Sequence, residues 1–517
     1  MNGMISNRRI VWLRFAIIAL VFLGGCAAGP DFKRPAPPVA TGYSPKPMVN
    51  YTVSADALGG VSQHFDPKKD IPYDWWELFK STELNNLVEQ AFKANPDIKA
   101  VQAALHQAQE YVAAQQGYFY PTIGANYSFS RTKLAGNNGG NAPGIQNNGD
   151  NLQTYSNPSG PAPYNGPIYY NYHTAQFTVG FVPDVFGLNR RQVESLQAQA
   201  DIQRFQLEAS YITLASNVVA AAIQEASLRA QIAAMEKVVS INKENLAIMQ
   251  AQEKQGYLSE LVVSAQVSAL SQSEQALIPM RLQLEQTRDM IRALAGGSPD
   301  KDVPETFRLS ELQLPQELPL SLPSKLVEQR PDVRAAEEQL HAASAQYGVS
   351  IANLMPQFSI AGDVGGMAPT PGWMFKGGGG FFDLASNVAY TIFDGGTLRA
   401  QSRAARDAMT QAGAQYRSTV IAALQNVADT LHAIQSDAAA LQEASKNEQA
   451  MLKARDMMRV QYETGYVSYQ TLLAADQNYQ QSIITLSQAQ ANRFGDTAAL
   501  YQALGGGWWN RNNNKVK

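Results

Sequence analysis

The sequence is poor in cysteine, histidine and charge. Cys26 is its only cysteine, so the chain can form neither an internal disulfide nor a thiolate metal site of its own. The five histidines are scattered without the spacing of metal ligands, and no serine-nucleophile, phosphate-loop or cysteine-nucleophile motif is present. We therefore expect the protein not to be an enzyme, and to hold no metal and no other cofactor.

Long apolar runs are also missing, so no transmembrane helix is expected after the N-terminus. Arg8, Arg9 and Arg14 precede an apolar run from Phe15 to Leu23. This run is shorter than the ~20 residues of a spanning helix and is typical of a secretory signal. Charged residues form 16% of the chain and the net charge is −3, which gives no basic field for nucleic acid. We expect an exported protein without a nucleic-acid partner.

The signal segment ends in Leu23-Gly24-Gly25-Cys26, which resembles a bacterial lipobox. In that motif the cysteine is lipidated and becomes the first mature residue. The alternative is ordinary signal cleavage, with Cys26 as a bystander. Ala27 stands where an aspartate would retain a lipoprotein at the inner membrane. The resemblance therefore implies a signal peptide over residues 1–25 and lipidation of Cys26 in the outer membrane of a Gram-negative cell.

The chain contains an internal duplication. The stretch NPDIKAVQAALHQAQ from Asn95 matches RPDVRAAEEQLHAAS from Arg330, and the matching residues keep a constant separation. Each copy has a helical stretch, two alternating segments joined by a loop, and a very long helical stretch. We expect a first repeat over 81–310 and a second over 311–504. A lipidated, extended segment over 26–80 precedes them, and a tail over 505–517 follows.

The long helical stretches predict hairpins over 188–296 and 397–504. From about Leu188 to Gln255 there is neither Gly nor Pro, and apolar residues recur with heptad-like spacing. At 1.5 Å per residue such a helix reaches roughly 100 Å, which exceeds a compact domain. Its many small and polar residues favour a tube wall over a dry core. Pro279 lacks a backbone donor and is expected to kink or break the second helix of the first hairpin.

Four alternating segments predict strands near 121–131, 173–183, 356–365 and 382–393. Each has about ten residues, the length of a tilted membrane-spanning strand, although the edge of a soluble sheet alternates equally well. Four strands cannot close a barrel, so several chains must share one. Because a barrel of about eight strands is filled by its own side chains, a conduit favours three chains and twelve strands.

Together, the lipobox, the duplicated unit, the FDGG turn from Phe393 and the C-terminal YQALGGGWW resemble the TolC family. More narrowly, they resemble NodT-type outer-membrane lipoproteins of resistance-nodulation-division efflux systems. The resemblance runs from Cys26 to Trp509. It implies an α+β membrane protein, a homotrimer whose twelve-stranded outer-membrane β-barrel continues as a long periplasmic α-helical barrel. A periplasmic adaptor, an inner-membrane pump and outer-membrane lipid are the implied partners, and passive efflux of drugs or other small molecules is the implied function.

The resemblance also assigns site residues near the hairpin tips. The adaptor-contact positions match Gly256, Tyr257 and Ser259 at the first tip and Gly465, Tyr466 and Ser468 at the second. The glycines have a simpler explanation, because they let the chain reverse between helices. The family's acidic gate positions are Thr471 and Ala474 here. Asp476 is therefore the periplasmic gate candidate, or simply a solvated helix carboxylate.

Two further hypotheses stay open. The same fold could be the outer-membrane outlet of a type I protein secretion system. From a different class, the chain could be a coiled-coil scaffold lipoprotein that forms no channel and has soluble strands. Detergent-resistant trimers and conductance in bilayers would separate a duct from a scaffold, and neighbouring genes for an adaptor and a pump would separate efflux from secretion.

Overall fold

The computed structural model describes residues 27–36, 42–45, 49–134, 146–147, 150–151 and 168–511. Cys26 lies outside the described residues. The chain divides into two compact units. The described part of the first unit consists of residues 27–32, Ala108–Ala198 and His341–Thr410, and the second unit takes up the rest. Each unit therefore draws on both halves of the sequence.

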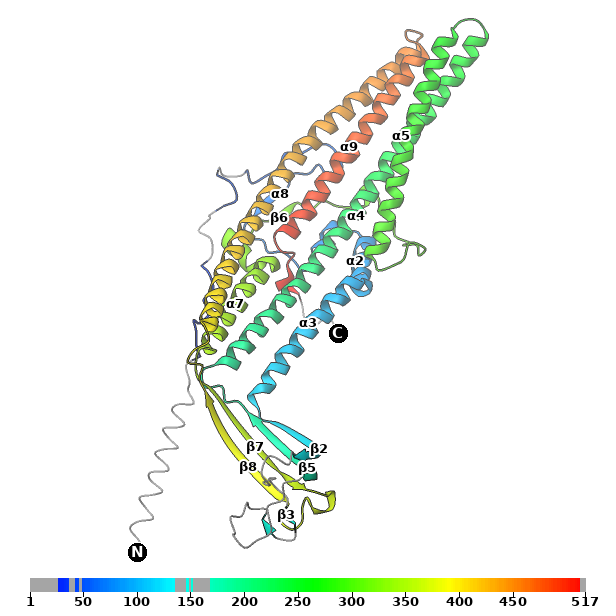
Figure 1. The fold of residues 1–517 in the computed structure, drawn as a ribbon. Helices are drawn as coiled ribbons and strands as arrows, with labels where there is room; N and C mark the ends of the chain where they lie inside the picture. Colours follow the sequence, from blue (N-terminus) through cyan, green and yellow to red (C-terminus); the bar gives the residue numbers. More distant parts are fainter. Residues whose placement is uncertain are drawn as a thin grey trace. The chain divides into compact units, whose positions relative to one another are not determined.

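Two pairs of long helices dominate the element order (Figure 1). The first pair is α4 (Leu188–Lys254) and α5 (Glu260–Leu294), and the second is α8 (Thr397–Glu463) and α9 (Tyr469–Ala503). Both α4 and α8 have 67 residues, and both α5 and α9 have 35. These equal lengths in matching order are what a duplicated sequence would produce.

Shorter helices occupy matching places in the two halves. They are α2 (Thr82–Ala94), α3 (Pro96–Gln116), α6 (Pro323–Gln329) and α7 (Pro331–Ala352). Both α3 and α7 begin with proline, which has no N–H to leave unsatisfied at the first helical position. Asp97 and Asp332 follow in the first turn, where a carboxylate complements the helix dipole. The Pro-Asp pairs of the sequence are therefore helix starts.

The two 67-residue helices begin in the same way, each after a turn that contains an aspartate. The Asp394 carboxylate accepts hydrogen bonds from the N–H groups of Gly396 (2.8 Å) and Leu398 (2.7 Å). The Asp184 carboxylate accepts one from the N–H of Asn189 at 2.8 Å. The first N–H groups of a helix have no partner within the helix, so these carboxylates stabilise its start. This explains the aspartate in the FDGG turn.

Pro279 was expected to kink or break the helix, and the break does not occur, because α5 continues through that residue. Pro279 is on the exposed side, where one missing N–H leaves its carbonyl partner to solvent. Two residues earlier, Leu277 is buried in a cluster with Met235 of α4 and Ile484 of α9. This packing holds the helix together across the proline, since tertiary contacts override local propensity.

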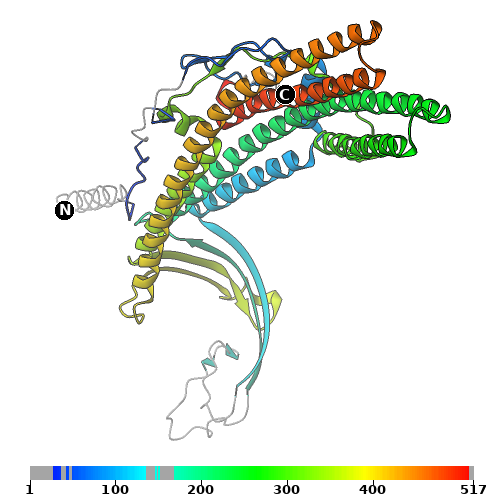
Figure 2. The same cartoon turned by 90° about the horizontal axis from the view of Figure 1, so that it is seen from above.

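The first unit contains a four-stranded antiparallel sheet in the order β2-β5-β7-β8. The strands are β2 (Thr122–Leu134), β5 (Ile168–Phe181), β7 (Gln357–Ala368) and β8 (Gly380–Ala389). Figure 2 shows the sheet as curved. β8 ends earlier than the expected residue 393, because its partner β7 begins directly after Pro356, which has no N–H for a ladder.

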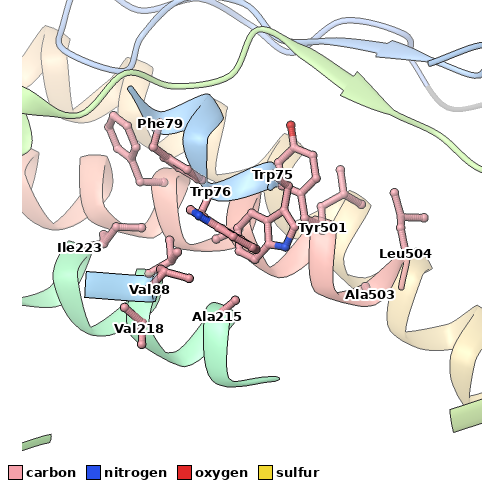
Figure 3. Close-up of a cluster of buried hydrophobic side chains, with 14 of the residues drawn as sticks. Trp75, Trp76, Phe79, Val88, Ala215, Val218, Ile223, Tyr501, Ala503 and Leu504 are labelled. Atoms are coloured by element: carbon pink, nitrogen blue, oxygen red, sulfur yellow. The ribbon is translucent and has the colours of Figure 1, made fainter. Parts of the chain in front are cut away.

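The main hydrophobic core lies in the second unit and joins the start of the chain to its end (Figure 3). Trp75, in the 3-10 helix Trp75–Phe79, stacks on Tyr501 of α9 with ring centroids 5.3 Å apart. Trp75 and Tyr501 are fully buried, and large aromatic side chains contribute much of the apolar area that stabilises a core. Two short strands, β1 (His64–Asp66) and β6 (Glu317–Pro319), pair in the same unit. A separate two-stranded pair comprises β3 (Gln146–Asn147) and β4 (Asp150–Asn151).

The glycine run near the C-terminus has a packing reason. Gly505, Gly506 and Gly507 all have positive φ (98°, 64° and 70°), which side chains rarely adopt. A Cβ atom at Gly507 would lie only 2.5 Å from the Pro72 carbonyl oxygen. The run therefore lets the end of the chain approach the backbone of the N-terminal segment.

Candidate functional site

One face of the four-stranded sheet is apolar and exposed, and we call it the apolar face. Residues paired across antiparallel strands lie on the same face. The register pairs Ile123 with Val179, Phe177 with Val364, and Val364 with Phe382. Ile123 is 76% exposed and Phe382 is 83% exposed. The exposed large apolar residues of this face are Ile123, Tyr127, Phe129, Tyr169, Phe177, Val179, Ile360, Val364, Phe382, Leu384 and Val388.

The opposite face of the sheet is polar. Asn126 is paired with Gln176, and Asp363 is paired with Thr178 on one side and Asp383 on the other. In the described part of the chain, β2 and β8 are edge strands with one partner each. An open edge presents unpaired backbone N–H and C=O groups. An exposed apolar face of this extent marks a contact with a membrane or with another protein.

The residues that follow Cys26 are held in a defined site on the first unit, which we call the N-terminal seat. The buried Arg191 guanidinium donates to the Ala28 carbonyl (3.1 Å) and to the Asp31 carboxylate (2.8 Å). The Ala28 N–H donates to the Phe186 carbonyl at 2.9 Å. Arg191 also pairs with Glu194 at 2.6 Å. Charge-assisted hydrogen bonds to a buried guanidinium fix the backbone of this segment.

Close backbone approaches complete the N-terminal seat. A Cβ atom at Gly348 of α7 would lie 3.0 Å from the Arg191 side chain and 3.1 Å from the Ala28 carbonyl oxygen. A Cβ atom at Gly187 would lie 2.8 Å from the Ala27 Cα. The segment beginning at Ala27 therefore packs against glycines that leave no room for a side chain. Sequence analysis missed the seat, because nothing in the spacing of these glycines marks them as neighbours.

At the hairpin tips, the glycines make turns and the tyrosines project outward. Gly256 and Gly465 have φ values of 78° and 80°, and nothing lies within 4 Å of a Cβ atom at either position. Their requirement is therefore for backbone conformation and not for space. Tyr257 is 77% exposed and Tyr466 is 85% exposed. Two large side chains at the tips are thus available for contact.

The tip serines begin the returning helices. Ser468 is the N-cap of α9, and its hydroxyl accepts a hydrogen bond from the Thr471 N–H at 3.3 Å. Ser259 is the N-cap of α5, although its side chain makes no capping bond. Thr471, which the sequence resemblance matched to a gate position, therefore takes part in the cap at its backbone.

Asp476 of α9, the gate candidate, approaches a cation on the neighbouring helix. Its carboxylate is 3.9 Å from Nε of Arg455 on α8. The same guanidinium pairs with Asp456 at 2.6 Å and lies over the Tyr479 ring, 4.6 Å from its centroid. The Asp476 charge is therefore partly balanced within its own chain, at the outer limit of an ion pair.

A hydrogen bond between α4 and α9, which we call the tip link, was missed by sequence analysis. The Tyr469 hydroxyl donates to the Glu244 carboxylate at 2.6 Å. This hydrogen bond, aided by partial burial, raises the pKa of Tyr469 to about 12, because the carboxylate holds the phenolic proton. The two residues are far apart in the sequence and no motif joins them.

A second missed feature is a buried charged cluster between α8 and α9. Arg493 is fully buried and donates to the Thr52 hydroxyl (3.0 Å) and the Val61 carbonyl (2.7 Å). Burial lowers its pKa to about 10. Burial, followed by the neighbouring carboxylate of Asp496, raises the pKa of Asp437 to about 7 against the opposing charge of Arg493. The cluster ties the N-terminal segment to both helices.

Among the described residues, no helix has both the length and the apolarity needed to cross a membrane. The same residues contain no group of three or more His, Cys, Asp or Glu side chains arranged to hold a metal ion.

A family model described as outer membrane efflux protein matches residues 87–297 and 322–506. The chain belongs to this family. This chain is 26% identical over 502 residues to the solvent efflux pump outer membrane protein SrpC of Pseudomonas putida. The alignment covers 95% of this chain and 97% of SrpC. The fold of this chain matches the Campylobacter jejuni CmeC outer membrane channel with a TM-score of 0.78 at 20% identity, over 95% of this chain and 97% of that one. The Neisseria gonorrhoeae MtrE outer membrane channel, in its open state, matches with a TM-score of 0.75 at 21% identity. This match covers 93% of this chain and 98% of the MtrE chain.

These comparisons confirm the relationship to outer-membrane efflux proteins that the sequence resemblance predicted. At the level of the family, they also confirm an efflux function and an outer-membrane location. The structural matches confirm the fold class in its coarse form, a mostly helical chain with a few strands. The family is one of channel proteins and not of enzymes.

Proposed function

We propose that three copies of this efflux protein form an outer-membrane exit duct. The observation that carries the proposal is the four-stranded sheet with an apolar face, a polar face and two open edges. In lipid every backbone group needs a partner within the protein, so the edge β2 of one copy would pair with β8 of the next. Twelve strands would close a barrel wide enough to conduct, whereas about eight would fill with side chains.

Within the trimer, the polar faces of the sheets would line the lumen and the apolar faces would contact lipid. The twelve long helices would continue the duct as an α-helical barrel in the periplasm. The duct is passive, and an inner-membrane pump acting through a periplasmic adaptor would supply the energy. The name of the relative SrpC refers to solvents, which supports small organic molecules as cargo. In this proposal the two sequence repeats, 81–310 and 311–504, each supply two strands and one hairpin.

Three local roles belong to the same proposal. Cys26 carries the lipid after removal of residues 1–25, and mass spectrometry of the mature N-terminus tests this.

The exposed Tyr257 and Tyr466, with their neighbouring glycines and serines, contact the adaptor. Photocrosslinking from these two tyrosines to the adaptor tests the contact, and crosslinks from elsewhere only would contradict it. Asp476, balanced by Arg455, contributes to a periplasmic gate.

The decisive experiment combines oligomeric state with conductance. Purified protein is expected to migrate as a trimer that heat dissociates, and to conduct as single channels in planar bilayers. Leu384→Asp on the apolar face should impair insertion, because a carboxylate facing lipid near mid-membrane is unfavourable. The control, Asn387→Asp, lies on the polar face of the same strand β8 and should still conduct. A monomer without conductance, or equal behaviour of the two variants, would contradict the duct.

The secretion alternative shares the fold and differs in cargo. Cells that lack the protein should become sensitive to small toxic compounds if it serves efflux. Loss of one secreted protein with unchanged drug sensitivity would instead support the type I outlet.

A further inference from the structure

The apolar face ends in two cations at the strand ends opposite the helices. Arg131 and Lys133 follow Phe129 at alternate positions of β2, so they lie on the same face as Ile123. Lys133 is paired with Tyr169 of β5 in the register. Within the four described strands, Arg131 and Lys133 are the only permanently charged residues on this face. Both side chains are exposed.

Neither cation is neutralised by the described part of the protein. No carboxylate there lies within ion-pair distance of Arg131 or Lys133. The Lys133 ammonium instead lies 5.4 Å from the centroid of the Tyr169 ring, a cation–π contact that orients it without balancing its charge. Two unbalanced cations side by side attract an anion, and the guanidinium suits the two-oxygen geometry of a phosphate.

Aromatic residues separate these cations from the aliphatic part of the face. Phe129 lies against His173 with ring centroids 4.6 Å apart, and the Tyr127 hydroxyl is 2.8 Å from Nδ1 of His173. Phe375, exposed in the loop between β7 and β8, lies close to Gly366, which is on the same face. Aromatic side chains with a polar group favour the level of lipid headgroups.

The order along β2 is therefore aliphatic, aromatic and then cationic. At about 3.3 Å per residue, Ile123 to Phe129 covers roughly 20 Å and Lys133 lies roughly 13 Å further along the strand. The apolar band of an outer-membrane barrel is about 25 Å tall. At a tilt of about 40°, the roughly 33 Å from Ile123 to Lys133 spans about 25 Å of depth. The strand therefore brings Lys133 to the headgroup edge of the band, with Arg131 just below it and the aromatic side chains in the adjoining part of the hydrocarbon.

We propose that Arg131 and Lys133 bind the phosphate groups of an anionic lipid in the leaflet at this end of the sheet. The inference rests on the proposed function, in which the apolar face contacts the membrane. α3 ends just before β2 begins, and α4 begins soon after β5 ends, so the helices join the sheet at the end away from Arg131 and Lys133. If the helices are periplasmic, the cations therefore belong to the outer leaflet. The ligand chemistry that the two cations recognise is a lipid phosphate, and lipid A, which carries phosphate groups, is the probe.

The test measures lipid A binding by the full-length trimer in mild detergent. Replacing both cations, as Arg131→Gln with Lys133→Gln, should weaken binding about thirtyfold, and each single replacement about fivefold. Enzymatically dephosphorylated lipid A should bind the wild type as weakly as it binds the double variant. Lys301→Gln, which removes an exposed lysine in a turn outside the sheet, is the matched control and should bind lipid A normally.

Three results would overturn the inference. The double variant could bind lipid A as the wild type does, or dephosphorylation could leave wild-type binding unchanged. Alternatively, the replacements could weaken binding of phosphatidylglycerol and leave lipid A binding intact. Conductance separates this failure from failure of the duct, because a double variant that conducts but binds lipid A normally refutes only the phosphate site. A wild type that neither trimerises nor conducts refutes the duct itself.

Discussion

The half-buried carboxyl group of Asp437, beside Asp496 and Arg493, makes the stability of the second unit depend on pH. Its ordinary pKa of 3.8 rises to about 7 in the folded protein, chiefly through burial and then through the Asp496 carboxylate. Between these two values the folded chain binds more protons than the unfolded chain. Stability therefore falls as the pH rises from about 4 to about 7 and stays low above that range.

The substitution Asp437→Asn removes the titrating charge and keeps the shape of the side chain. A rise from 3.8 to about 7 corresponds to an upper limit of about 4 kcal/mol, at about 1.4 kcal/mol per pKa unit. Asp437 is only half-buried, and solvent screening reduces this value. Since part of the penalty already exists near pH 5, we expect the stability of the variant relative to wild type to increase by about 1–2 kcal/mol between about pH 5 and pH 8.

Thermal unfolding of the detergent-purified protein, followed by its helical circular dichroism, measures this difference. For a chain of this length, 1 kcal/mol corresponds to about 1 °C in Tm, so the relative shift should be about 1–2 °C. Asp429→Asn, an exposed acid on the same helix α8, is the control and should show no relative shift with pH. A constant difference in stability between Asp437→Asn and wild type at both pH values would refute the raised pKa of Asp437.

Two further predictions concern the tips and the N-terminal seat. Tyr469→Phe removes the tip link to Glu244, and Asp476→Asn removes the charge of the gate candidate. If these residues help to keep the proposed duct closed, each variant should raise its leak conductance. A variant whose recordings are unchanged would show that its residue has no gating role. Gly348→Leu fills the space taken by Arg191 and should free the segment of the seat, seen as faster deuterium uptake in the N-terminal peptide. Wild-type uptake in that peptide would contradict the packing argument.

The strands were accessible from the sequence because alternation is a local signal. Ile123 and Phe177 alternate with polar neighbours within their predicted strands, and the register brings both to one face. The limits of β8 were not accessible, since they depend on where its partner begins after Pro356. Likewise, the sequence predicted a kink or a break at Pro279, whereas packing of neighbouring residues on three helices keeps the helix unbroken there.

At the tips too, some features could be predicted from the sequence and others could not. The turn at Gly256 could be predicted, because a positive φ is a local requirement. The partners of Asp476 and Tyr469 could not, because contacts between two long helices depend on their relative rotation and shift. A change of one residue in that shift would move Arg455 away from Asp476 without altering any local pattern. Sequence motifs therefore locate the tips, and only the structure identifies which charges meet there.

The N-terminal seat and the two cations of β2 bear independently on how the apolar face is positioned in the bilayer. Ala28 is bonded to Phe186, which follows the helix-side end of β5, so a lipid on Cys26 would start within a few residues of that end. Arg131 and Lys133 lie at the other end of the same sheet. A lipid anchor at one end and a phosphate-binding pair at the other would fix both edges of the face at opposite leaflets. The sheet would then have one orientation and one depth in the bilayer before its edges pair with those of other copies.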